Sequence, residues 1–193
     1  PRYAGEPHEV GPLARMLVGY ATGSREIKDL VDSTLKSVGL PLAALFSTLG
    51  RTASRAIETG FVAGRIEGWV NELLSNIKSG DLRSWTKCDV PAGEVQGRGM
   101  TDPPRGALGH WIRIRDKVIE NYQAVVPSTW NCSPRDAAGK RGPYEESLVG
   151  TRLARADQPL EILRTIHSFD PCMACAVHII DPHTNEVRKY RVA

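Results

Sequence analysis

The sequence lacks a hydrophobic run that could span a membrane, since no apolar stretch approaches the about 18 residues that a spanning helix requires. It also lacks a strong excess of one charge. Its 25 lysines and arginines stand against 22 aspartates and glutamates, which gives a net charge of +3. Surfaces that bind nucleic acid or anionic membranes usually carry a larger basic excess. These absences argue against a membrane-spanning protein and against nucleic acid as a partner.

Cysteine is scarce, with four in 193 residues. Four cysteines would be a sparse disulfide framework for a chain of this length. Cys88 and Cys132 stand alone, whereas Cys172-Met173-Ala174-Cys175 forms a Cys-x-x-Cys pair. That spacing suits a shared metal ion or a redox pair better than a structural disulfide. A glycine-rich loop that could cradle a phosphate is also missing, so the sequence gives no support to nucleotide chemistry.

The composition that is present is ordinary for a globular protein, with 41% hydrophobic and 24% charged residues. A chain of 193 residues can bury a sizeable core in one domain or in two small ones. It opens at Pro1 directly into polar sequence, with neither an initiator methionine nor a signal peptide. We therefore expect a processed chain or part of a longer protein.

Helical periodicity dominates the first 80 residues. Pro12 suits the first position of a helix, and Ser24 is a candidate N-cap for the next one. Apolar residues then recur at helical spacing up to about Lys78, which predicts two or three helices in all. Three glycines within this pattern are expected to allow another backbone to pack closely in a helix bundle: Gly60, Gly64 and Gly68.

The second half is mixed. Residues 88–105 are rich in glycine and proline and are predicted to be loop-like. Two strand-like runs, 111–114 and 118–126, flank Asp116-Lys117 and predict a hairpin. An irregular segment follows over 127–142, and short helices are expected over 144–148 and 159–166. The predicted fold class is α+β and mainly helical: a helix bundle (1–80), then a small antiparallel strand region and irregular metal-site loops (81–178).

The residues with the clearest chemistry lie in Asp170-Pro171-Cys172-Met173-Ala174-Cys175, with His178 three residues further on. Two thiolates at this spacing can share one soft or borderline cation. A pair of buried thiols without a ligand role is a simpler alternative. A zinc site is another, although it usually takes four ligands from two such pairs. A thioredoxin-like redox motif is disfavoured, because it should follow a strand and open a helix.

Four blocks together resemble the large subunit of nickel–iron hydrogenases. The Asp-Pro-Cys-x-x-Cys-x-x-His block that ends at His178 resembles the C-terminal metal motif of that family. The other three blocks occur in the family's order and, with this one, cover nearly the whole chain: Gly11-Pro12-Leu13-Ala14-Arg15 preceded by Pro1-Arg2-Tyr3, Pro104-Arg105-Gly106-Ala107-Leu108-Gly109-His110-Trp111, and Val126-Pro127-Ser128-Thr129-Trp130-Asn131 followed by Ser133-Pro134-Arg135-Asp136.

The resemblance implies a nickel–iron centre whose iron carries carbon monoxide and cyanide ligands. Cys172 matches the terminal nickel thiolate, and Cys175 matches a thiolate that bridges to iron. Pro104-Arg105 matches the groups close to one cyanide, and Pro127-Ser128 matches the contact to the other. His178 matches the C-terminal residue of the mature subunit, which ligates magnesium or iron together with a backbone carbonyl that aligns with Cys132.

The resemblance also implies reversible heterolytic cleavage of H2 into protons and electrons. A nearby base must take the proton, and Cys172 is the first candidate because a thiolate bound to one metal keeps free lone pairs. Arg105 overhangs the open metal position in the family and ranks second, since an arginine normally stays charged. Asp170 matches a carboxylate that is paired to that arginine.

Two departures from the family stand out. The family needs an N-terminal Cys-x-x-Cys pair and an N-terminal glutamate for proton exit, and neither is found here, so the chain resembles the C-terminal portion of a large subunit. Alone, that portion would be inactive. Residues 179–193 continue past His178, as in precursors whose tail an endopeptidase removes after nickel insertion.

The implied partners are an iron–sulfur small subunit, the maturation endopeptidase, nickel chaperones and H2. The mature complex is expected on the periplasmic side of the membrane, held by its small subunit, and the precursor in the cytoplasm. Three alternatives stay open: a zinc-binding domain, a fragment recognised only by the maturation machinery, and the homologous subunit of respiratory complex I. The last generally lacks the cysteine motif.

Overall fold

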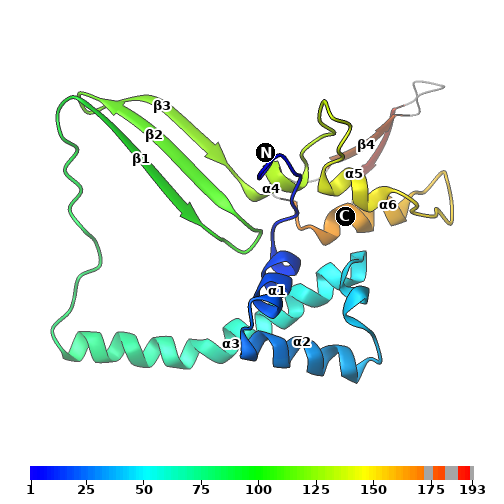
Figure 1. Cartoon of the computed structure of the whole chain (residues 1–193), viewed down its shortest axis with the longest axis horizontal. Helices are drawn as coiled ribbons and strands as arrows, with labels where there is room; N and C mark the ends of the chain where they lie inside the picture. Colours follow the sequence, from blue (N-terminus) through cyan, green and yellow to red (C-terminus); the bar gives the residue numbers. More distant parts are fainter. Residues whose placement is uncertain (172–175, 181–186, 192–193) are drawn as a thin grey trace. The chain divides into compact units, whose positions relative to one another are not determined.

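The computed structural model describes residues 1–171, 176–180 and 187–191, the last two ranges by their backbone. Helices outnumber strands in this part of the chain, and the predicted α+β, mainly helical class is confirmed. The helices are α1 (Pro12–Ala21), α2 (Arg25–Ser37), the 3-10 helix η1 (Leu42–Leu45), α3 (Thr48–Lys78), α4 (Pro127–Asn131), α5 (Pro143–Leu148) and α6 (Leu160–Ser168) (Figure 1). The strands are β1 (Glu94–Thr101), β2 (Leu108–Arg115), β3 (Val118–Val125), β4 (Ala176–Ile180) and β5 (Val187–Arg191).

The chain forms two compact units. The first, called the helix–sheet unit, is Val10–Val126. The second, called the terminal unit, combines Pro1–Glu9 with Pro127–Ala193. The N-terminal segment therefore belongs with the C-terminal third of the chain. The boundaries proposed from the sequence at residues 80 and 178 stay predictions.

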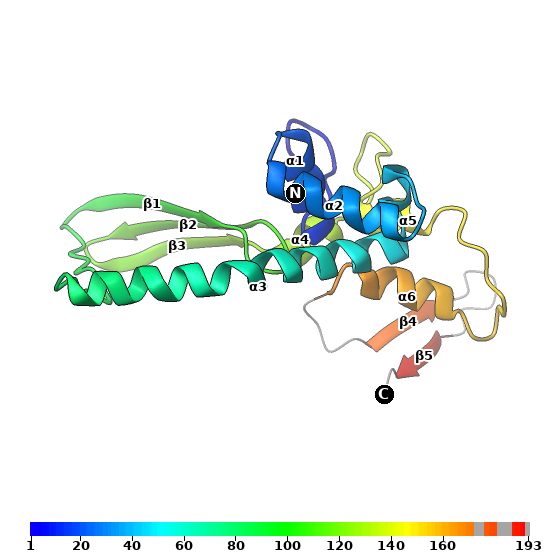
Figure 2. The same cartoon turned by 90° about the horizontal axis from the view of Figure 1, so that it is seen from below.

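The core of the helix–sheet unit lies where α1, α2 and η1 pack on the N-terminal half of α3 (Figure 2). Pro12 opens α1 as predicted, because its ring presets a helical φ and its missing N–H is not needed there. Ser24 precedes α2, although its side chain makes no capping bond. Ser47 caps α3 by accepting a bond from the amide of Gly50 at 3.0 Å. The buried apolar side chains of this core are Leu13, Met16, Val31, Leu35, Leu45 and Ile57.

The C-terminal half of α3 presents an exposed apolar stripe at helical spacing. Its members are Val62, Ile66, Trp69, Val70, Leu73, Leu74 and Ile77. The predicted packing role of the three glycines is not met by this chain, since no described atom comes within 4 Å of a Cβ built at Gly60, Gly64 or Gly68. Among the described residues, no helix combines the length and apolar character needed to cross a membrane.

The three-stranded sheet is an antiparallel meander in the order β1-β2-β3. The predicted hairpin is confirmed as β2 and β3. Its turn residues Asp116 and Lys117 both have positive φ, at 48° and 66°, which suits the right-handed twist of the flanking strands. The loop predicted over 88–105 is wrong in part, because Glu94–Thr101 forms β1. Gly97 and Gly99 hide the alternation of a strand, and the ladder to β2 supplies its stability.

The terminal unit is built from short elements. The helices predicted near 144–148 and 159–166 are confirmed as α5 and α6, with small shifts in their ends. The segment predicted to be irregular contains one additional short helix, α4. Strands β4 and β5 pair antiparallel, and His178 lies opposite Lys189 in their register.

Candidate functional site

The residues predicted for the site fall in both units. Pro104 and Arg105 lie in the helix–sheet unit, on the connection between β1 and β2. In the terminal unit, Pro127 and Ser128 open α4, Cys132 follows it directly, and Asp170 follows α6. His178 lies in β4, while Cys172 and Cys175 lie outside the described residues. The predicted pairing of Arg105 with Asp170 would join the two units and stays a prediction.

A tight turn presents Arg105. The amide of Gly106 donates to the carbonyl of Pro103 at 2.9 Å, and Arg105 is exposed at the tip. Gly106 has a φ of +127°, which side-chain-bearing residues rarely adopt. A Cβ there would lie 2.6 Å from Val10 Cγ2 and 2.7 Å from the amide nitrogen of Gly11. A Cβ on Gly11 would in turn lie 3.0 Å from the Arg105 carbonyl, so the two glycines allow backbone to pack on backbone beside Arg105.

Arg15 of α1 also forms hydrogen bonds to this turn. Its Nη1 donates to Asp102 Oδ1 at 2.7 Å and to the carbonyl of Pro103 at 3.0 Å. Its Nη2 donates to the carbonyl of Pro104 at 2.7 Å. The guanidinium is also paired with Glu58 of α3, through Nε to Oε1 and through Nη2 to Oε2 at 2.8 Å. One arginine therefore connects two helices with the backbone that immediately precedes Arg105.

The electrostatics of this contact favour a fixed charge. The side chains of Arg15 and Glu58 are 21% and 17% exposed. Hydrogen bonding to Glu58 raises the pKa of the Arg15 guanidinium above its ordinary value, burial opposes that rise, and the charges of Glu58 and Asp102 add to it. A bidentate, charge-assisted pair of this kind is stronger and more directional than a neutral hydrogen bond.

In the terminal unit, Ser128 and Cys132 sit one helical turn apart. The amide of Cys132 donates to the carbonyl of Ser128 at 2.8 Å, so both predicted positions belong to the same short helical segment. Asn131 and Ser133 are buried on either side of Cys132, at 2% and 4% exposure, while the Cys132 residue is exposed. The buried neighbours fix the backbone and leave the Cys132 thiol outside the packing.

The Arg2 side chain forms hydrogen bonds to the segment that follows Cys132. Its Nε donates to Asp136 Oδ2 at 3.0 Å, its Nη1 donates to Ser133 Oγ at 2.9 Å, and its Nη2 donates to the carbonyl of Pro134 at 2.8 Å. Asp136 also accepts bonds from the amides of Ala138 and Lys140. The amide bond from Lys140 and the Arg2 guanidinium hold the pKa of Asp136 below its ordinary value.

Asp170 stands in an uncommon backbone conformation at the end of α6. Its φ is 55°, the left-handed region that only a few non-glycine residues adopt, and Pro171 follows it. The Asp170 amide donates to the carbonyl of His167 at 2.9 Å. Phe169 is buried and packs its ring against Tyr144 of α5, with the ring centroids 4.7 Å apart. The turn that leads into the Cys-x-x-Cys pair is thus anchored on the residue before Asp170.

The donor chemistry fits part of a thiolate metal site. Among residues 1–171, whose side chains the structure describes, no cluster of three or more metal-ligating side chains is found. Cys88 and Cys132 are exposed free thiols in different units. Two soft thiolates for a nickel or iron ion can come from Cys172 and Cys175, which is half of the set that a four-thiolate centre requires.

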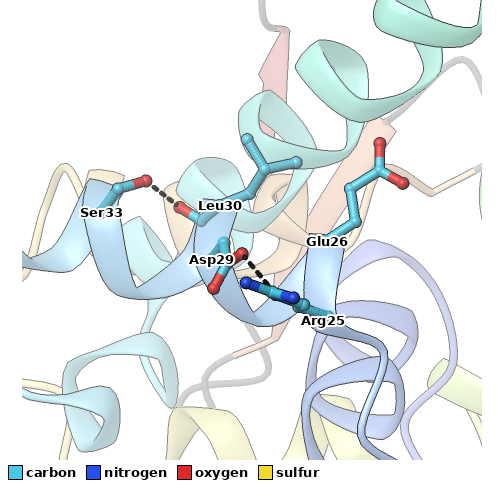
Figure 3. Close-up of a pocket in the computed structure, with 5 residues that line it drawn as sticks. All are labelled: Arg25, Glu26, Asp29, Leu30 and Ser33. Carbon is cyan, nitrogen blue, oxygen red and sulfur yellow. Dashed lines mark hydrogen bonds and ion pairs between the residues drawn. The ribbon is translucent and has the colours of Figure 1, made fainter.

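The hollow lined by Arg25, Glu26, Asp29, Leu30 and Ser33 is not a candidate for the site. It is an open surface of α2 (Figure 3). Arg25 and Asp29 form an exposed ion pair at 3.8 Å, and Ser33 donates to the carbonyl of Leu30. None of the predicted site residues within 1–171 is among these five.

No role was predicted from the sequence for Arg2, Arg15, Glu58 or Asp136. Arg2, Arg15 and Asp136 stand within the blocks that carry the family resemblance, and this was the only available signal. The pairs that they form span 43 to 134 positions along the chain, so no local pattern could reveal them. His110, predicted to be a structural hydrogen-bonder, does contact the hydroxyl of Tyr122 through Nδ1.

The comparisons with known proteins agree over nearly the whole chain. A family model described as nickel-dependent hydrogenase matches residues 1–178. The uptake hydrogenase large subunit of Rhizobium leguminosarum bv. viciae is 51% identical over 197 residues, covering 100% of this chain and 33% of that protein. The quinone-reactive Ni/Fe-hydrogenase large chain of Wolinella succinogenes is 53% identical over 193 residues, with the same coverage. The chain thus spans about a third of the length of these relatives.

Solved structures give the same result. The reduced Ni-Fe-Se hydrogenase from D. vulgaris Hildenborough matches with a TM-score of 0.67 and 38% identity, over 89% of this chain and 36% of that one. The H2-activated [NiFeSe]-hydrogenase of Dm. baculatum matches with a TM-score of 0.72 and 36% identity, over 89% of this chain and 35% of that one.

Proposed function

Because the chain belongs to the nickel-dependent hydrogenase family, we propose that it is the C-terminal portion of the catalytic subunit of a nickel–iron hydrogenase. The proposed reaction is the reversible heterolytic cleavage of H2 into protons and electrons. The observation that carries the proposal is the family match over residues 1–178, a range that includes Cys172, Cys175 and His178. The names of the relatives, which are large subunits of hydrogenases, support it.

Cys172 and Cys175 would hold the metal centre, and the other two thiolates would come from the part of the subunit that precedes this chain. When bound, a nickel–iron centre with carbon monoxide and cyanide on iron supplies the Lewis acid and the electron acceptor for H2. Pro104 would lie beside one cyanide, and Pro127 with the hydroxyl of Ser128 beside the other. Donors of this kind orient the ligands of a metal and tune it.

The proton released by heterolysis would go first to the Sγ atom of Cys172. Arg105 would act as a fixed positive charge, because a guanidinium keeps its proton at ordinary pH. Its exposure at the tip of a tight turn agrees with this role. Asp170 would orient that guanidinium as its partner carboxylate. This division gives proton transfer to a sulfur and electrostatic stabilisation to an arginine.

His178 and the carbonyl of Cys132 would ligate a magnesium or iron ion near the mature C-terminus. We propose that an endopeptidase removes residues 179–193 after nickel chaperones have delivered the metal. The end of the family match at residue 178 supports this boundary. Cleavage there would remove all of β5 and the last two residues of β4, so the β4–β5 pairing, in which His178 lies opposite Lys189, would be lost.

The proposed electron acceptor is an iron–sulfur small subunit, which would also carry the complex to the periplasmic side of the cytoplasmic membrane. The relatives named as uptake and quinone-reactive hydrogenases support such a membrane-associated assembly.

The test uses the full-length large subunit produced with its small subunit. We expect Cys172→Ser and Cys175→Ser to lose nickel and to lower H2-dependent dye reduction by more than about a hundredfold, since each removes a thiolate ligand. Cys88→Ser is the matched control. Its thiol is exposed in the helix–sheet unit, so nickel content and activity should stay within about twofold of wild type.

Zinc in place of nickel in the wild-type complex, with no H2-dependent dye reduction, would contradict the proposal. The zinc-binding alternative would then stand.

A further inference from the structure

We propose that Arg15 is a positioning residue for H2 cleavage, which holds the turn that presents Arg105 through the backbone carbonyls of Pro103 and Pro104. This inference rests on the proposed function, because it concerns how the chain places the arginine of that site. It gives a role to a residue of α1 that is not among those predicted for the site.

The contacts of Arg15 converge on the residues just before Arg105. Two of its bonds go to consecutive carbonyls, at 3.0 Å to Pro103 and 2.7 Å to Pro104, and one goes to Asp102 at 2.7 Å. Carbonyl bonds hold the backbone itself, and they are independent of the side chains of the turn. Since Pro103 also accepts the amide of Gly106, the carbonyl that closes the turn is the one that Arg15 binds.

The pair with Glu58 fixes the orientation of the Arg15 guanidinium. Its carboxylate receives two donors of the Arg15 guanidinium, so the planar group cannot rotate without breaking the pair. The remaining donor positions then point at the turn. Because Glu58 lies on α3 and Arg15 on α1, the turn is tied to the buried core between those helices.

A second contact limits the turn at Gly106. The backbone at Val10-Gly11 packs against Gly106 and against the carbonyl of Arg105, with no room for a Cβ on Gly106. Arg105 is therefore held between the Arg15 bonds before it and the Gly11 contact after it. Small displacements of an active-site group can reduce the rate by about a hundredfold, so a fixed turn matters for an arginine that acts by its position.

The experiment uses the full-length large subunit with its small subunit and compares Arg15→Gln with wild type in two readouts. The first is hydrogen exchange of the backbone amides in the peptide over residues 102–107. The loss of charge-assisted bonds should speed exchange there by about tenfold or more, while α2 is unchanged. The second is steady-state H2 oxidation. We expect kcat to fall about ten- to hundredfold and nickel content to stay constant.

The KM for H2 should change by less than about twofold. H2 carries no charge, so a displaced guanidinium affects the charge separation in the transition state and not the binding of substrate. Compared with Arg15→Gln, Arg15→Lys should recover part of the kcat and part of the protection from exchange. An ammonium keeps the charge but lacks the planar guanidinium that can donate to Glu58 and to the carbonyls at the same time.

Arg65→Gln is the matched control. Arg65 is paired with Glu26, which also links α3 to another helix of the same unit, and no described contact of that pair reaches the turn. Both its kcat and the exchange of residues 102–107 should equal those of wild type. If Arg15→Gln does not fold, Asp102→Asn leaves the Arg15–Glu58 pair intact and should give a smaller change, about two- to fivefold, in the same direction.

Wild-type exchange and wild-type kcat in both Arg15→Gln and Asp102→Asn would overturn the inference. Equal losses in Arg15→Gln and Arg65→Gln, with faster exchange throughout the unit, would also overturn it, because that pattern is general destabilisation. A wild-type complex without hydrogenase activity would contradict the proposed function instead. The exchange comparison would still decide whether Arg15 holds the turn.

Discussion

Arg15 and Arg2 perform comparable tasks in the two units of the chain. Each lies in the first 15 residues, and each donates to backbone carbonyls of a segment that adjoins a residue of the candidate site. They differ in the carboxylate that pairs with each guanidinium. Arg15 is paired with Glu58 on the long helix α3, whereas Arg2 is paired with Asp136, which belongs to the very segment that Arg2 holds.

That difference indicates two levels of rigidity. The turn before Arg105 is tied through Arg15 to α1 and α3, which pack in the helical core. The segment after Cys132 is tied to the N-terminal residues and closed on itself by the bonds of Asp136. We therefore expect the Arg105 turn to unfold abruptly, together with the helical core. The segment after Cys132 should open locally and gradually.

The largest effect is expected at Gly106. Gly106→Ala combines a φ that side-chain-bearing residues rarely adopt with a Cβ placed 2.6 Å from Val10, so we expect the full-length subunit to lose about 3 kcal/mol of unfolding free energy. Denaturant titration followed by circular dichroism measures this loss. Gly60→Ala is the control, because Gly60 is exposed within α3 with nothing near its Cβ. It should stabilise by about 0.5–1 kcal/mol. A Gly106→Ala protein as stable as wild type would remove the evidence for tight packing at the turn.

The next effect is expected at Arg2. Arg2→Gln removes the guanidinium that donates to Asp136, Ser133 and the carbonyl of Pro134. We therefore expect the unfolding free energy to fall by about 2 kcal/mol in the same titration. Hydrogen exchange should accelerate over residues 132–140 and stay unchanged over 102–107. Arg155→Gln is the control. Its pair with Asp157 is local and exposed, and it should cost less than about 0.5 kcal/mol. Acceleration in both peptides would show that the two units are not held independently.

The smallest effect is a dependence on pH at Asp136. Its folded pKa is lowered by the Lys140 amide and by Arg2, so its contribution to stability is present above the ordinary aspartate pKa of about 3.9 and is lost as pH falls through the lower folded value. Wild type should melt a few degrees above Asp136→Asn at pH 6, and the two should converge as the pH falls below about 4. A constant difference over this range would show that the Asp136 contribution does not depend on its charge.

The sequence predicted the elements that carry a local signal. Pro12 marked the start of α1, and Asp116-Lys117 between two apolar runs marked the β2–β3 turn. The strand β1 was missed because Gly97 and Gly99 remove the side chains whose alternation would reveal it. Its pairing with β2 is a property of the folded chain.

The candidate site could be predicted as a set of residues but not as an arrangement. The motif around Cys172 and Cys175 pointed to thiolate metal chemistry, and the resemblance added Arg105 and Ser128. The bonds from Arg15 to Glu58 and to the Arg105 turn connect residues that are 43 to 89 positions apart. No periodicity or spacing rule reports such contacts, since they arise only when α1, α3 and the β1–β2 connection meet.

We propose above all that this chain is the C-terminal portion of a nickel–iron hydrogenase catalytic subunit. The most direct test is the intact mass and metal content of the subunit purified from its own cell by affinity to its small subunit. We predict a chain longer than 193 residues that ends at His178 and carries nickel and iron. A 193-residue chain that keeps residues 179–193 and carries zinc or no metal would contradict the claim.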